Sequence, residues 1–273
     1  MVVDLMKIID SKIYFNGSFS LIRPEWLKNE FGFLTGEKIK IAVIDSGCDK
    51  VITTDSRIVK GISFIGDEEG FTFEQNDDYF DKLGHGTACI DIILQIAPAV
   101  EIIPIKVFNS SLETSIEIIV AAINYAIDYG VDLINLSLGT KLSEALYPLY
   151  VVCEKAKQKN IIIVSANGNL DNNSYPAIFE NVISISSTYT ESKFDFLYNS
   201  GDAVECLADG YPTNALGLNG RRQALGGNSF ASPIVTGIVT LLVEKFSSKD
   251  LDCIRQLLEK YSINNKKSSG RRK

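Results

Sequence analysis

Apolar residues along the chain form short β-branched runs that alternate with longer segments of helical spacing. The runs predict buried strands, which lie at 39–44, 101–108, 131–138, 161–166 and 181–187. The longer segments predict helices, which lie at 85–96, 113–129, 142–159, 229–246 and 249–261. Near-continuous apolar strands separated by helices are typical of a parallel sheet covered on both faces. We therefore predict an α/β fold with a mostly parallel central sheet and helices on both faces.

Three segments break this alternation. Residues 66–82 predict an acidic loop, and residues 209–228, rich in Gly and Asn, predict a hairpin and loop before the next helix. Residues 264–273 are polar and basic, which predicts a solvated, disordered tail. The chain has no internal repeat and no linker. We expect a single domain over 1–263, with 1–38 as its lead-in segment.

The charge balance narrows the function classes. Lys and Arg number 27 against 34 Asp and Glu, a net charge of −7, whereas a nucleic-acid-binding protein normally has a basic footprint. The chain has one histidine, which excludes zinc sites built from two or three histidines. We therefore expect no nucleic-acid partner, and any catalytic histidine must be His85.

The cysteine pattern and the hydropathy of the chain indicate the cellular compartment. The five cysteines are widely spaced and include no CxxC pair, which is typical of free thiols in a reducing compartment. No run of 18 apolar residues predicts a transmembrane helix. Charges interrupt the first residues, where a signal peptide would need an apolar stretch. These features favour a cytoplasmic protein without a membrane partner.

Three polar residues stand where predicted strands end or predicted helices begin. Asp45 ends a strand in IAVIDSG, His85 opens a helix in LGHGTA, and Ser229 lies in the first helical turn of GGNSFASP. Functional groups collect at the carboxyl ends of parallel strands. An acid, a base and a hydroxyl are the parts of an activated serine nucleophile. Taken singly, each residue also fits a turn or helix-cap role.

The order of these residues and the blocks around them carry a resemblance. Asp, then His, then Ser is the subtilisin order and not that of the α/β-hydrolases, whose G-x-S-x-G motif is absent from GNSFA. The matching blocks are AVIDSGCD (42–49), GHGTACI (84–90), INLSLG (134–139), SANGN (165–169) and GNSFASPIVTG (227–237). Over about 39–242 the chain therefore resembles the subtilisin-like serine proteases, or subtilases.

The resemblance implies a role for each matching residue. Asp45 would orient the base, His85 would act as general base and acid, and Ser229 would be the nucleophile. Asn169, which follows Gly168, matches the side-chain donor of the oxyanion hole. The substrate would bind as an added strand along Ser137, Leu138 and Gly139. The wall of the pocket for the P1 residue, on the amino side of the cleaved bond, would be Ala166, Asn167 and Gly168.

Several positions depart from the family pattern. Asn228 stands where the family usually has Thr, Asn167 where most relatives have a small apolar residue, and Ser174 where many have glycine. Asp91 replaces a frequent glycine, and we expect it to alter the packing near His85. The short helix after His85 leaves no room for the calcium-binding loop of many secreted relatives. We therefore expect no metal and no cofactor at the site, with only a weak calcium site elsewhere left open.

The resemblance also leads to expectations about which substrate side chains the enzyme prefers. Leu170 would lie at the rim of the P1 pocket and Ser174 at its back, where a hydroxymethyl group narrows the pocket. We expect a medium-sized, uncharged P1 residue. Asp78 and Asp81 lie just before His85, where relatives shape the P2 side of the substrate-binding groove, but a solvated acidic loop is the preferred interpretation of these two residues.

The resemblance implies a monomeric serine endopeptidase that acts on peptides through an acyl-enzyme. Secreted relatives carry a signal peptide and a folding pro-region, for which we see no counterpart in the first 40 residues. One role would be maturation, removing the leader of a modified precursor peptide such as a lanthipeptide. General intracellular protein turnover is the alternative. A non-catalytic peptide-binding module would be expected to lack a triad or oxyanion residue, and the four candidates are all present.

Overall fold

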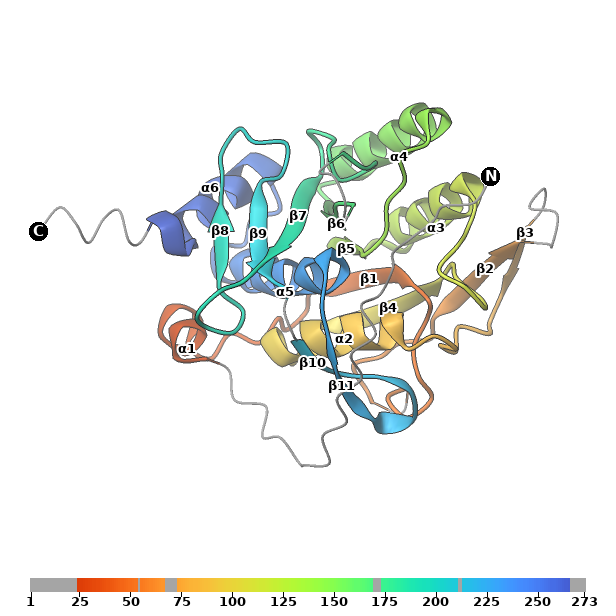
Figure 1. Ribbon diagram of the computed structural model, residues 1–273, viewed down its shortest axis with the longest axis horizontal. Helices are drawn as coiled ribbons and strands as arrows, with labels where there is room; N and C mark the ends of the chain where they lie inside the picture. Colours follow the sequence, from red (N-terminus) through yellow and green to blue (C-terminus); the bar gives the residue numbers. More distant parts are fainter. Residues whose placement is uncertain (1–23, 54, 67–72, 169–172, 211–212, 266–273) are drawn as a thin grey trace, which may run out of the picture.

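The computed structural model describes residues 24–53, 55–66, 73–168, 173–210 and 213–265 (Figure 1). The helices are α1 (Glu25–Phe31), α2 (His85–Ile96), α3 (Ile116–Tyr129), α4 (Leu146–Gln158), α5 (Asn228–Phe246) and α6 (Leu251–Tyr261). The first strands are β1 (Lys40–Asp45), β2 (Ile62–Gly66), β3 (Phe73–Asn76), β4 (Glu101–Lys106), β5 (Leu133–Leu136) and β6 (Ile162–Ala166). The others are β7 (Ile183–Thr188), β8 (Phe196–Tyr198), β9 (Cys206–Asp209), β10 (Thr213–Leu216) and β11 (Arg222–Leu225).

A nine-stranded sheet runs through the described part of the chain in the order β3-β2-β4-β1-β5-β6-β7-β9-β8. The pairs from β2 to β9 are parallel, and only the edge strands β3 and β8 are antiparallel to their neighbours. The predicted mostly parallel sheet is confirmed. The predicted hairpin at 209–228 is also confirmed, because β10 and β11 pair antiparallel.

Helices cover both faces of the sheet, as predicted (Figure 1). Successive side chains of a strand point to opposite faces. On β1, Ile41 and Val43 pack into the cluster that holds α2, α5 and α6, whereas Ala42 and Ile44 pack into the cluster that holds α3 and α4. Strand β1 therefore contributes to two cores, which explains its near-continuous apolar run.

Helix α5 is apolar enough to resemble a membrane span. It has 19 residues and a mean hydropathy of 1.3, but 83% of its apolar window is buried inside the protein. It packs against α2 and against strands β5, β6, β7 and β9. These contacts are those of the core helix of a layered α/β domain.

The structure corrects the expectations for two irregular segments and adds a helix in a third. The predicted loop 66–82 contains β3, which pairs with β2. The lead-in segment contains α1, whose Leu27 and Phe31 join the core on the side of α2 and α5. Asn264, the first residue of the predicted disordered tail, is ordered, because its side chain accepts the backbone N–H of Tyr198 and donates to the carbonyl of Tyr198. Residues 266–273 of the predicted tail lie outside the described residues.

Candidate active site

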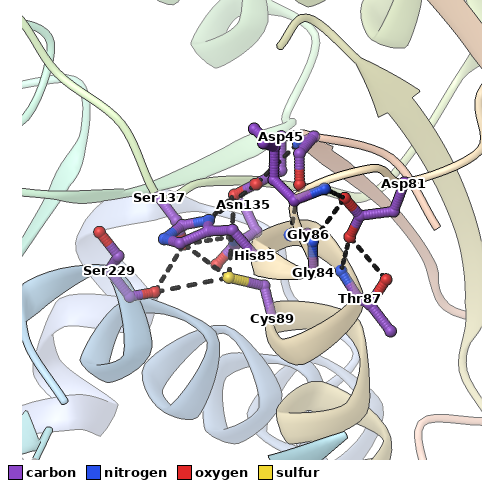
Figure 2. A network of polar contacts seen from close by, with 12 residues as sticks. Asp45, Asp81, Gly84, His85, Gly86, Thr87, Cys89, Asn135, Ser137 and Ser229 are labelled. Carbon is purple, nitrogen blue, oxygen red and sulfur yellow. Dashed lines mark hydrogen bonds and ion pairs between the residues drawn. The ribbon is translucent and has the colours of Figure 1, made fainter. Parts of the chain in front are cut away.

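The carboxyl ends of β1 and β5 meet the amino ends of α2 and α5, and this junction brings the three candidate side chains together (Figure 2). Asp45 is the last residue of β1, and His85 is the first residue of α2. The Nδ1 atom of His85 lies 2.7 and 2.9 Å from the two carboxylate oxygens of Asp45. Asp45 also accepts the backbone N–H of Ser46 at 2.7 Å. The carboxylate is fully buried, so its partners hold it in one orientation.

Glycines make the close approach of β1 and α2 possible. Gly84 precedes His85 with φ of +85°, a left-handed conformation that glycine adopts without strain. A Cβ atom on Gly86 would lie 2.5 Å from the carbonyl oxygen of Gly47. Any side chain at 86 would therefore push α2 away from Asp45.

Asp81 holds the start of α2 in place. Its Oδ1 accepts the backbone N–H groups of Leu83 and Gly84, both at 2.8 Å. Its Oδ2 accepts the N–H and hydroxyl of Thr87 at 3.0 and 2.6 Å. Burial acts to raise the pKa of Asp81, but these hydrogen bonds lower it overall. The expectation that Asp81 faces the P2 residue is therefore wrong: the carboxylate is buried and supports the helix that carries His85.

Ser229 is the second residue of α5, and its backbone is anchored from outside the helix. The residue four positions later is Pro233, which has no N–H to donate to the carbonyl of Ser229. That carbonyl accepts the hydroxyl of Ser137 at 2.8 Å instead. Ser137 in turn accepts an N–H from the Asn135 side chain at 3.0 Å. A helix-capping role for Ser229 does not apply, because the helix begins at Asn228 after Gly227.

Cys89 lies under the junction, one helical turn after His85. Its Sγ atom lies 3.8 Å from Asp45 Oδ2, 3.4 Å from Ser137 Oγ and 3.6 Å from the carbonyl oxygen of Ser229 (Figure 2). Burial, followed by the nearby Asp45 charge, raises the pKa of the Cys89 thiol. The cysteine is thus a protonated donor that contacts the candidate acid and the backbone of the candidate nucleophile.

The second ring nitrogen of His85 is the uncommitted group of this network. Nε2 has no hydrogen-bond partner among the described residues. The ring packs against Phe230, with centroids 5.0 Å apart, and Phe230 directly follows Ser229. Burial is the largest effect on the pKa of His85 and acts to lower it, but the Asp45 carboxylate and Cys89 together outweigh burial and hold that pKa well above 6.5. The arrangement is a base whose tautomer is set by an acid and whose other nitrogen is available for proton transfer.

Comparison with known proteins agrees with this geometry. The profile of the Subtilase family (peptidase S8) matches residues 36–271. The chain belongs to the Subtilase family. It is a serine endopeptidase of the subtilisin type, and its substrates are peptides.

Similarity to known subtilases extends over most of this chain. Subtilisin DY of Bacillus licheniformis is 29% identical over 249 residues, which are 84% of this chain and 85% of that protein. An intracellular serine protease of Paenibacillus polymyxa is 29% identical over 224 residues, 76% of this chain and 67% of that protein. A crystal structure of a cold adapted subtilisin-like serine proteinase matches with a TM-score of 0.69 and 22% identity, covering 84% and 83% of the two chains. That likeness supports the fold.

The segments predicted to form the P1 pocket of this subtilase come together. Gly139, after β5, lies beside Ser174: a Cβ atom on Gly139 would be 2.9 Å from the Ser174 hydroxyl. The same hydroxyl lies 2.8 Å from the backbone nitrogen of Gly168, after β6. Leu138 and Ala166 are buried at the ends of these strands. Asn169, the predicted oxyanion donor, and Leu170, predicted at the rim of the P1 pocket, lie outside the described residues.

Two interactions were missed from the sequence. The Asp91 carboxylate accepts hydrogen bonds from the Arg222 guanidinium and from the backbone N–H of Leu216, both at 3.0 Å. Asp91 therefore secures the β10–β11 hairpin to α2. The expectation that it alters the packing near His85 is wrong. Asn135 accepts the hydroxyl of Thr236 at 2.8 Å and so ties α5 to β5. A buried Asn inside an apolar strand was the available signal for the second interaction, because such groups need partners.

We expect mercurials to inhibit this subtilase through Cys89. The ligand atoms of Asp45, His85 and Cys89 all lie within 4.8 Å of one another, so a thiophilic ion bound to the sulfur would also engage the carboxylate and imidazole. The measurement is peptidase activity against mercurial concentration. Cys89→Ser should remain active and lose the sensitivity, whereas Cys48→Ser, the control for the next buried thiol, should keep it. Equal sensitivity of Cys89→Ser and the wild type would contradict the assignment.

Proposed function

We propose that Asp45, His85 and Ser229 form the catalytic triad of this endopeptidase. The observation that carries the proposal is the 2.7 Å contact between Asp45 and His85 Nδ1, with Nε2 left uncommitted beside the helix turn that holds Ser229. The Ser229 oxygen attacks the peptide carbonyl while His85 Nε2 takes the proton of the Ser229 hydroxyl. His85 then gives this proton to the leaving amine. Water then hydrolyses the acyl-enzyme by the same route.

The oxyanion hole in this proposal combines a side chain and a backbone group. The side-chain donor is Asn169, and the second donor is the N–H of Ser229 in the first turn of α5, where the helix dipole favours negative charge. We expect Asn169→Ala to lower kcat by roughly 10²–10³-fold. The comparison variant is Asn167→Ala, measured on the same peptides. A larger kcat loss in Asn167→Ala than in Asn169→Ala would show that the oxyanion assignment is wrong.

We propose that the peptide binds as an extended strand along Ser137, Leu138 and Gly139, opposite Ala166, Asn167 and Gly168. The support is that both segments continue adjacent parallel strands, β5 and β6, and converge on Ser174. The buried Ser174 hydroxyl occupies the space between them, which favours a medium-sized, uncharged P1 residue. A cleavage map dominated by Arg or Lys at P1 would contradict this pocket.

We expect hydrolysis without a metal or cofactor. Helix α2 passes through a short turn into β4, so the chain after His85 carries no long insertion of the kind that binds calcium in the relatives noted above. The test is the peptidase rate after treatment with EGTA and after return of calcium. A rate that collapses in the chelator and recovers with calcium would overturn this expectation.

The cellular role that we propose is maturation of a precursor peptide by leader removal, carried out in the cytoplasm by a monomer. The support is the compact catalytic domain. General protein turnover is the second candidate, supported by the relative named an intracellular serine protease. Mapping the bonds cut in a proteome-derived peptide library separates the two. A narrow sequence motif around the cut supports maturation, whereas cuts at many unrelated sequences support turnover.

A further inference from the structure

One buried side chain links the nucleophile helix to two strand ends. Asn228, the residue before Ser229, accepts the backbone N–H and the hydroxyl of Ser187 with its Oδ1, at 2.7 and 2.8 Å. Its Nδ2 donates to the carbonyl oxygens of Asn167 and Gly168 at 3.0 and 3.1 Å. The start of α5 is thereby tied to β7 and to the segment that follows β6.

A second buried amide fixes the same segment from its other side. Asn167 Oδ1 accepts the N–H of Gly168 at 2.9 Å, the N–H of Ser174 at 3.0 Å and the hydroxyl of Ser174 at 2.9 Å. The backbone N–H of Asn167 donates to the carbonyl of Ile185 at 2.7 Å. Both N–H groups and both carbonyls of Asn167 and Gly168 therefore have fixed partners. The segment cannot shift without breaking several hydrogen bonds together.

The three side chains are closed to water. Asn167, Ser174 and Asn228 are 4%, 2% and 6% exposed, so solvent does not compete for their hydrogen bonds. Asn167 Nδ2 is the exception in this network, because it is buried without a partner among the described residues. The contribution of the Asn167 side chain to the network is therefore made by its oxygen, which accepts all three of the hydrogen bonds given above.

We propose that Asn167, Ser174 and Asn228, here called the amide brace, are positioning residues that lock the P1 wall against the nucleophile helix. This inference rests on the proposed function, in which 166–168 form that wall. A yielding wall would accommodate a longer P1 side chain, whereas a fixed wall turns each excess methylene into a clash. The amide brace therefore makes the enzyme discriminate P1 side chains steeply by length.

The test uses peptides that differ only at P1, in the series alanine, 2-aminobutyrate, norvaline and norleucine. In the wild type, kcat/KM should fall by roughly 10–100-fold for one methylene beyond the best residue. Asn228→Asp keeps the acceptor for Ser187 but turns an oxygen toward the two carbonyls, and Ser174→Gly removes the hydroxyl. Each variant should reduce that fall to about threefold or less. Because both substitutions act on one unit, the double variant should reduce the dependence of kcat/KM on P1 length no further than either single variant does.

The control is Asn181→Asp. Asn181 is a buried Asn that donates to Glu154 at 3.2 Å near the opposite end of β7, so this change breaks a comparable bond away from the site. It should lower the melting temperature and leave the length dependence at P1 unchanged. Wild-type length dependence in both brace variants, or additive effects in the double variant, would overturn the inference. Failure of the wild type to cleave any peptide or react with a fluorophosphonate would instead overturn the proposed function.

Discussion

Ser229→Ala is expected to abolish peptide hydrolysis while leaving the protein folded. The loss in kcat should be on the order of 10⁶-fold, a magnitude taken from subtilisin, in which the triad acts as one unit. The fold should survive because the contacts from Ser137 and Cys89 reach the carbonyl oxygen of Ser229, which alanine retains. The measurements are kcat on a peptide that the wild type cleaves and the melting temperature of both proteins.

Ser232→Ala is the matched control for that experiment. Ser232 is a buried serine on the same helix, and its hydroxyl donates to Asn135 at 3.2 Å. Its loss should lower stability by about 1 kcal/mol and leave kcat within a few-fold of the wild type. Activity of Ser229→Ala within tenfold of the wild type would remove this hydroxyl from the role of nucleophile.

His85→Ala should be about as damaging, because an unassisted serine hydroxyl is a weak nucleophile. The pH dependence supplies a second readout. The base must be neutral to accept a proton, so activity is lost as pH falls through the pKa of His85. Since Asp45 raises that pKa against the opposing effect of burial, the acid limb of kcat/KM in the wild type should have its midpoint above pH 6.5.

Asp45→Asn tests the cause of that midpoint. The amide removes the charge that raises the pKa of His85, so the acid limb should move to lower pH. The rate should also fall by about 10⁴-fold, the loss known for this change in a chymotrypsin-type triad, because the amide favours the wrong imidazole tautomer. An acid limb that stays in place would show that another group sets it.

Burial on both faces decides how much of the fold is predictable. The central strands β1, β5 and β6 lie in near-continuous apolar runs, and each of their ends agrees with the prediction to within two residues. Strand β3 carries exposed polar residues at the sheet edge, and β8 has three residues, so neither produces a periodic signal. Helix α1 has seven residues, too few for its two buried positions to establish a helical period.

Some residues of the candidate site have a local sequence signal, whereas others are brought together only by the fold. Asp45, His85 and Ser229 are predictable because each lies in a contiguous motif. The amide brace is not predictable, since Asn228 and Asn167 are 61 residues apart and only the packed strand ends bring them together. Asp81 does have a local signal: an Asp that precedes a helix start by a few residues, followed by Thr87, fits side-chain capping better than substrate contact.

The anchoring of Ser229 from outside its own helix determines when the enzyme can become active. Its carbonyl depends on Ser137, 92 residues earlier, and on Cys89, 140 residues earlier, while His85 depends on Asp45, 40 residues before it. A chain that is still being synthesised, or that has released α5 in a partial opening, holds the acid and the base but not the nucleophile in register. Peptidase activity is therefore expected only where α5 is packed against α2 and the end of β5, and an opening that releases α5 should switch it off.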